Sequence, residues 1–69
     1  MNKITVYIAD REDGGIRVWS DDLPGLILSG KNRVGVLADI GPAVKAIRAY
    51  KGLTDEVQID AVFERIGHG

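Results

Sequence analysis

The sequence contains no cysteine, so neither a disulfide nor a thiolate metal site can stabilise it. Its single histidine, His68, lies between two glycines, and a lone histidine in such a segment is a poor candidate for catalysis. No apolar run approaches the roughly 20 residues needed to cross a bilayer, and Met1 is not followed by a signal-peptide pattern. We therefore expect a cytoplasmic protein without a membrane partner.

An excess of one charge is also missing. Nine Lys and Arg oppose ten Asp and Glu, for a formal net charge of −1. Dedicated nucleic-acid binders usually carry a basic excess or a dense basic patch, so this balance argues against that class. With 69 residues, we expect one domain over residues 1–69 with a marginal core, which favours efficient packing or self-association as further stabilisation.

Alternation of apolar and polar residues predicts strands, and a three-to-four spacing predicts a helix. The strands are expected at 4–8, 16–20, 26–28 and 57–61, and the last one runs on through 62–63. The loss of alternation at 62–63 leaves a bulge or a turn into a short helix as alternatives there, and a frayed tail is expected over 64–69. The order βββαβ predicts a two-layer α/β sandwich of the α+β class. Its first three strands form an antiparallel meander, and the last strand lies parallel to the first, giving the order third, second, first, last.

The stretch that organises the chain is Ile16–Gly30, in which two apolar runs flank a tight turn. Pro24 has the φ required at the first inner position of a type II turn, and Gly25 accepts the positive φ of the second. Asp21 and Asp22 precede this turn, where their carboxylates can accept hydrogen bonds from its N–H groups.

Trp19 lies near the end of the second predicted strand, 16–20. Alternation places it on the face opposite Val18, beside Arg17 and across from Tyr7. If no helix covers that face, Trp19 is a contact residue; otherwise it belongs to the core. The third strand, Leu26–Leu28, is apolar on both faces, which indicates cover on both sides and, in so short a chain, a second subunit.

The helix is expected to begin near Arg33, after Asn32 as N-cap, and to end before Gly52. Gly41-Pro42 should either kink it or divide it in two, because Pro42 lacks an N–H group. Its apolar stripe comprises Val36, Leu37, Ile40, Val44, Ile47 and Tyr50. Its basic residues are expected on the opposite side or near its ends: Lys31, Arg33, Lys45, Arg48 and Lys51.

Catalytic constellations are absent from the sequence. Ser20 and Ser29 have no base at a recognisable spacing, and Gly14-Gly15 does not match a phosphate-binding loop. The one conceivable metal set lies in predicted turns: Asp10, Glu12, Asp13, Asp21 and Asp22. Carboxylates in turns do not match the strand-borne carboxylates of RNase H-like nucleases. We therefore expect no enzyme activity, no metal and no cofactor.

Three segments together resemble the HicB-like antitoxin family: the strand 4–8, the stretch 15–25 and the helix from Arg33. The sharpest motif is Asp22-Leu23-Pro24-Gly25, and the similarity spans about residues 3–63. The resemblance implies a partial RNase H-like βββαβ domain without nuclease activity. It also implies neutralisation of a HicA-type mRNA-cleaving toxin, and frequent self-association.

The resemblance is to a short, stand-alone form of the family. Members often carry a C-terminal DNA-binding domain; since little follows Phe63, we do not expect this chain alone to bind DNA directly. We expect a homodimeric protein-binding module, an antitoxin or an antitoxin-derived protein, with a partner surface at Glu12, Asp13, Trp19, Asp21, Asp22, Leu23 and Pro24. The alternatives are a small nucleic-acid binder that uses the basic side of the helix, or a HicB-like protein of another function.

Overall fold

A four-stranded mixed sheet and one helix make up residues 2–64, the part of the chain that this computed structural model describes. His68 and the predicted tail from residue 65 onwards lie outside these residues. The elements in chain order are β1 (Asn2–Asp10), β2 (Ile16–Trp19), β3 (Ile27–Gly30), α1 (Arg33–Tyr50) and β4 (Val57–Glu64).

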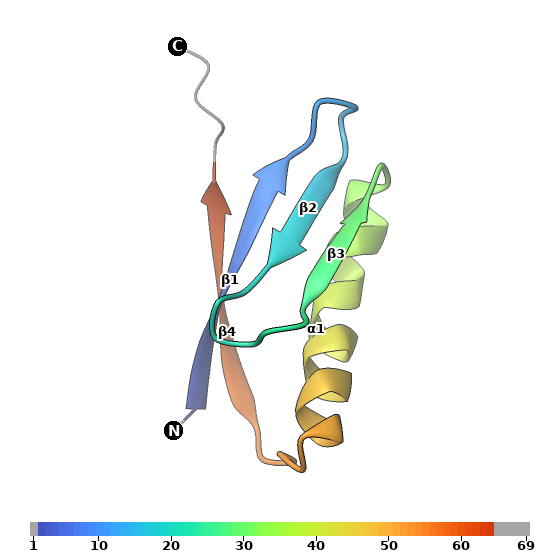
Figure 1. The fold of residues 1–69 in the computed structure, drawn as a ribbon. Helices are drawn as coiled ribbons and strands as arrows, with labels where there is room; N and C mark the ends of the chain where they lie inside the picture. Colours follow the sequence, from blue (N-terminus) through green and yellow to red (C-terminus); the bar gives the residue numbers. More distant parts are fainter. Residues whose placement is uncertain (1, 65–69) are drawn as a thin grey trace.

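The sheet has the predicted spatial order, β3-β2-β1-β4. β1 pairs antiparallel with β2, and β2 pairs antiparallel with β3, so the first three strands form the expected meander. β4 returns beside β1 in parallel. Helix α1 packs on one face of this sheet (Figure 1), which confirms the two-layer arrangement.

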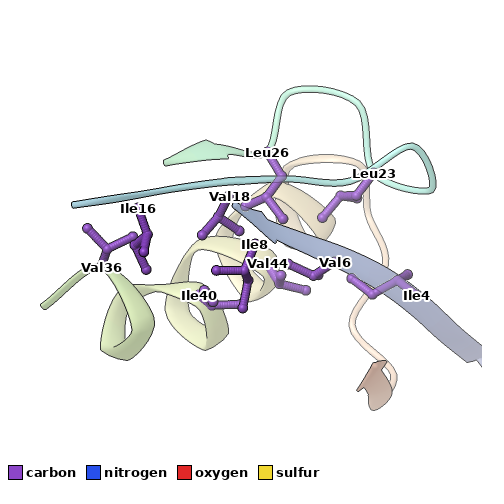
Figure 2. Close-up of a cluster of buried hydrophobic side chains, with 10 residues drawn as sticks. All are labelled: Ile4, Val6, Ile8, Ile16, Val18, Leu23, Leu26, Val36, Ile40 and Val44. Atoms are coloured by element: carbon purple, nitrogen blue, oxygen red, sulfur yellow. The ribbon is translucent and has the colours of Figure 1, made fainter. Parts of the chain in front are cut away.

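The core lies between α1 and the sheet face that α1 covers. Figure 2 shows helix side chains meeting strand side chains there, with Val36 beside Ile16 and Val44 close to Val6. The buried cluster comprises Ile4, Val6, Ile8, Ile16, Val18, Leu23, Leu26, Val36, Ile40 and Val44. Strict alternation in β1 and β2 produces this face, because every second side chain of a strand points to the same side.

Helix α1 has the predicted ends. Asn32 caps it, since its side-chain oxygen accepts a hydrogen bond from the Gly35 N–H at 3.0 Å. At the other end Gly52 takes a φ of 80° and its N–H donates to the Ala49 carbonyl at 2.9 Å. This is the helix-terminating geometry that a glycine adopts without strain.

Pro42 does not divide the helix, which runs unbroken from Arg33 to Tyr50. Of the two predicted alternatives, the split is therefore wrong. A proline ring disfavours helical backbone for the residue before it, in part because it clashes with that residue's Cβ. That residue is Gly41, which has no Cβ to contribute to the clash.

The buried side of α1 differs from the predicted stripe at its C-terminal end. The buried helix residues are Val36, Ile40, Val44 and Arg48. A spacing of four advances about 40° per step around a helix of 3.6 residues per turn, so this line winds around α1. Its last member, Arg48, therefore faces away from Tyr50, which is 94% exposed. Tyr50 was wrongly predicted to lie on the apolar stripe.

β4 runs on through Val62 and Phe63, as predicted, and ends at Glu64, which was predicted to lie in the tail. It pairs regularly with β1 over this stretch, so the alternative of a bulge or a terminal turn at 62–63 is wrong. The N-terminal half of β4 packs on the core through Val57 and Ile59. Because α1 lies over β2 and β3 (Figure 1), the end of β4 is uncovered, and Phe63 is 61% exposed.

Two isoleucines provide a direct test of this division between core and surface. Ile8 is 2% exposed and Ile27 is 73% exposed. Ile8→Ala should lower the free energy of unfolding by about 2–5 kcal/mol, because it removes buried methyl groups and leaves a cavity. Ile27→Ala, the same chemical change at the surface, should alter it by at most about 0.5 kcal/mol. Urea denaturation followed by circular dichroism measures both, and equal effects would contradict this assignment.

Candidate functional site

The sheet face opposite α1 carries an apolar row that crosses all four strands. Trp19 of β2 is directly opposite both Tyr7 of β1 and Ile27 of β3. Tyr7 is in turn opposite Val62 of β4. Because directly paired residues point to the same face, Val62, Tyr7, Trp19 and Ile27 form one line, which we call the open-face row.

Trp19 is at the centre of the open-face row. Its ring stacks on Tyr7, with ring centroids 5.6 Å apart and an interplanar angle of 26°. The guanidinium carbon of Arg17 lies 5.2 Å from the Trp19 ring centroid, in cation–π geometry. The predicted neighbours of Trp19 are therefore confirmed. They leave both aromatic residues only partly buried, on a face that α1 does not cover.

The ends of the open-face row are more exposed than its centre. Ile27 is 73% exposed and Val62 is 40% exposed. Ile27 is the outward residue of the third strand, which the sequence predicts to be covered on both sides. The structure shows cover on the inner side, where Leu26 is 1% exposed. The outer side of that strand is open.

The acidic loop between β1 and β2 adjoins the open face. A shallow hollow is lined by outward-facing Ala9 and Arg17 and by the loop residues Asp10, Arg11, Glu12 and Asp13. Asp13 also holds the loop, because its carboxylate accepts a hydrogen bond from the Gly15 N–H at 3.0 Å and pairs with Arg11 at 3.1 Å. Glu12 is exposed beside it. Of the two predicted contact acids in this loop, Glu12 is thus the more available.

The turn between β2 and β3 has mainly a structural role. Leu26 donates from its N–H to the Leu23 carbonyl at 3.1 Å, and Gly25 has a φ of 99°, as the predicted type II turn requires. Leu23 is 4% exposed and belongs to the core, so it cannot line the predicted partner surface in this conformation. Pro24 and Asp21 are exposed.

Asp22 ties this turn to β1 instead of capping the turn itself. Its carboxylate accepts a hydrogen bond from the Thr5 N–H at 2.8 Å, where the predicted donors were the N–H groups of the turn. Ser20 completes the connection: its hydroxyl donates to the Thr5 carbonyl at 2.5 Å and accepts from the Asp22 N–H at 3.2 Å. β2 ends at Trp19 and so leaves the Thr5 N–H and carbonyl of β1 without a strand partner on that side. Asp22 and Ser20 supply the hydrogen bonds that these two backbone groups need.

The carboxylates do not form a metal site in the described part of the chain. Within residues 2–64, no three side chains of the His, Cys, Asp and Glu types gather as metal ligands would. The predicted acidic set is divided between opposite ends of β2 (Figure 1). One of its members, Asp10, pairs with Arg33 at 2.6 Å.

The basic residues of the helix do not form one continuous free surface either. Arg33 is held by Asp10. Arg48 was predicted on the exposed basic side, but it is 6% exposed, and this prediction is wrong. Its guanidinium donates to the Asp55 carbonyl at 2.6 Å and to the Asp55 carboxylate at 3.0 Å. Arg48 thus anchors the loop that leads into β4, while Lys45 remains exposed.

Within residues 2–64, no helix is both long and apolar enough to cross a membrane. A scan against protein-family models, a search of curated proteins and a search of solved structures each found no match to this chain. The geometry of the open face is therefore the main evidence on which a function can be proposed.

The sequence alone identified the centre of this site but missed its ends. Trp19, Tyr7 and Arg17 follow from alternation within two strands. Ile27 and Val62 depend on the register between strands, which a single sequence does not fix. The apolar residue on the outer side of the third strand was the available signal for Ile27.

We predict that Trp19→Ala folds but is less stable than the wild type. Because Trp19 is only partly buried, the loss should come from the Tyr7 stack and the Arg17 contact, about 1–2 kcal/mol. Urea denaturation followed by far-UV circular dichroism measures it. A variant that fails to fold would show that Trp19 belongs to the core.

Arg48 and Lys45 test the division between structural and free cations. Arg48→Ala should lower the free energy of unfolding by about 1–3 kcal/mol, because it removes charge-assisted hydrogen bonds and the packing of a buried side chain. Lys45→Ala, an equivalent charge loss at an exposed position on the same helix, should change it by at most about 0.5 kcal/mol. Thermal or urea unfolding of the pair decides between the two roles, and equal losses would contradict the anchoring role of Arg48.

Proposed function

We propose that this protein is a non-enzymatic, HicB-like protein-binding module whose partner docks on the open-face row. The partner proposed is a small basic RNA-cleaving protein, of the kind that the HicB-like resemblance implies. In this proposal the protein acts as an antitoxin by covering the partner's active surface, and it contributes no catalytic group.

The observation that carries the proposal is the uncovered apolar row centred on Trp19. Aromatic residues and arginine are enriched at protein interfaces, because they supply a large contact area together with a polar or cationic group. Here a stacked Tyr7 and Trp19 lie beside Arg17, with more exposed Ile27 and Val62 at the two ends. A contiguous apolar row with polar surroundings is typical of a docking surface.

Charge around the open face favours a basic partner. Glu12 and Asp13 lie in the hollow at one end of the face, and exposed Asp21 lies in the turn at the other end. Asp60 also points to this face, where it pairs with Lys3 at 3.0 Å. Acidic groups around an apolar centre accelerate association with a basic protein and disfavour acidic competitors.

The HicB-like part of the proposal is supported by element order and by the roles of the motif residues. The order βββαβ, with β4 parallel to β1, is the topology that the resemblance implies, and a partial RNase H-like fold is proposed on that basis. Within the motif, Asp22 bonds β1, Leu23 fills the core, and Pro24-Gly25 makes the turn. The motif therefore supports a shared fold, whereas the binding role rests on the open-face row.

The test is capture of the partner from the native host on immobilised protein, with three baits. The wild type should retain a small basic protein in stoichiometric complex, and Ile27→Lys should lose it, because a lysine there places an unpaired charge within the apolar contact. Val34→Lys is the matched control: Val34 is 78% exposed on α1, away from the open face, and its substitution should leave capture unchanged.

The captured protein should then be purified and assayed for RNA cleavage. Cleavage should stop when one equivalent of the wild-type protein is added, and should continue with Ile27→Lys. A partner that is retained equally by all three baits would place binding elsewhere on the molecule. A partner without RNA-cleaving activity would refute the antitoxin role while leaving the docking surface intact.

A further inference from the structure

β4 is an unprotected edge strand. It is eight residues long, contains neither lysine nor proline, and pairs with β1 along one side only. The opposite edge of the sheet, β3, has four residues and is followed directly by Lys31. Proteins usually protect long edges with lysine, proline or a covering element, because unpaired N–H and C=O groups recruit another strand. Within residues 2–64, no lysine, proline or covering element protects β4, whose charged residues are Asp60 and Glu64.

The inner side of β4 extends the core out to this free edge. Ile59, Ala61 and Phe63 are in register with the buried side of β1. Ile59 is partly buried, whereas Phe63 is 61% exposed. Beside them, a groove between α1 and the start of β4 is lined in part by Val44, Ala49, Leu53, Val57 and Ile59. The apolar layer therefore continues beyond the helix that covers the rest of it.

We infer that β4 pairs antiparallel with β4 of a second copy of this chain, which makes a two-fold symmetric dimer with one continuous sheet. A two-fold axis that relates adjacent antiparallel strands runs perpendicular to the sheet. Both α1 helices then lie on the same side, and the inner row of one β4 meets the inner row of the other. The open-face row lies on the opposite side of the sheet and stays free.

The charges of β4 select the register of this pairing. In the register that places Asp60 opposite Asp60 of the second copy, Glu56 also lies opposite Glu64. In the register that places Val62 opposite itself, Asp60 lies opposite Glu64. Both registers set like charges against each other, which destabilises the pairing. With Ala61 opposite itself, Asp60 faces Val62 of the second copy, and the Gln58 amide faces the Glu64 carboxylate, to which it can donate a hydrogen bond. This register avoids like-charge pairs.

The same register gives the apolar residues of the inner row their best neighbours. Ile59 lies opposite Phe63 of the second copy, so each exposed phenylalanine gains an aliphatic contact. Two other registers avoid like-charge pairs, with Ile59 or with Phe63 opposite itself. Each pairs a shorter part of β4, and neither places Ile59 opposite Phe63 of the second copy. This self-complementarity favours a second copy over an unrelated peptide, and a small core gains from the added burial.

A single engineered cysteine tests the register, because the chain has no cysteine of its own. Directly opposed residues of antiparallel strands have Cα atoms about 4.5–5.5 Å apart, within the range that a disulfide spans. Ala61→Cys should therefore give a covalent dimer on mild oxidation, seen on a non-reducing gel. Ser29→Cys, an exposed position on the far edge strand β3, should remain a covalent monomer under the same conditions.

Light scattering of the wild type and of two lysine variants tests the interface itself. The wild type should have the mass of a dimer. Ala61→Lys should have the mass of a monomer, because two lysines would face each other at the axis, and its circular dichroism should be unchanged, since Ala61 is exposed in the single chain. Ala46→Lys, exposed on α1, should remain a dimer.

Three results would overturn the inference. One is a wild type that has the mass of a monomer in light scattering even when its concentration is raised 100-fold. Another is a dimer that Ala61→Lys does not dissociate, and the last is a dimer in which Ala61→Cys does not cross-link. None of these results depends on the proposed antitoxin function, because the dimer is measured with the purified protein alone.

Discussion

The packing of one helix against one face of a four-stranded sheet is the contact on which the rest of this structure depends. Val36, Ile40 and Val44 meet the inner side chains of β1 and β2 (Figure 2). A sheet has two faces, and a single helix cannot cover both. Every surface proposed to bind a partner follows from what α1 leaves uncovered.

Two different surfaces result from this incomplete cover. The outer face keeps a row of apolar and aromatic side chains across all four strands, which is suited to a partner that lies flat on the sheet. Within residues 2–64, the inner face lacks cover towards β4, where the apolar layer reaches the edge of the sheet. The outer face presents side chains and the edge presents backbone groups, so both can be occupied at once.

Much of the fold could be predicted from the sequence because its signals are local. Alternation defined β1 and β2, Asn32 and Gly52 marked the limits of α1, and Pro24-Gly25 marked the turn. The strand order followed from the meander of the first three strands and from the right-handed crossover through the helix. Local signals failed where tertiary contacts determine whether a side chain is buried. Arg48 was assigned to the side of the helix away from the apolar stripe, yet it is buried, and its hydrogen bonds to Asp55 offset the cost of burying its charge.

The candidate site shows the same limit. The position of Trp19 relative to Arg17 and Tyr7 could be predicted, because it depends on strand periodicity and on one hairpin. The contribution of Val62 could not, because the parallel pairing of β1 and β4 joins residues from the two ends of the chain. Leu23 was expected at the partner surface because it belongs to the acidic turn motif. Its burial shows that the motif is needed for the fold itself.

Quenching of tryptophan fluorescence tests the claim that the open face around Trp19 is the docking surface. Trp19 is the only tryptophan in the chain, so its fluorescence reports on this face alone when the partner lacks tryptophan. Acrylamide should quench Trp19 readily in the isolated protein, and this quenching should fall markedly when the captured partner is added to saturation. Quenching that stays unchanged in a saturated complex would show that the partner binds elsewhere and would contradict the claim.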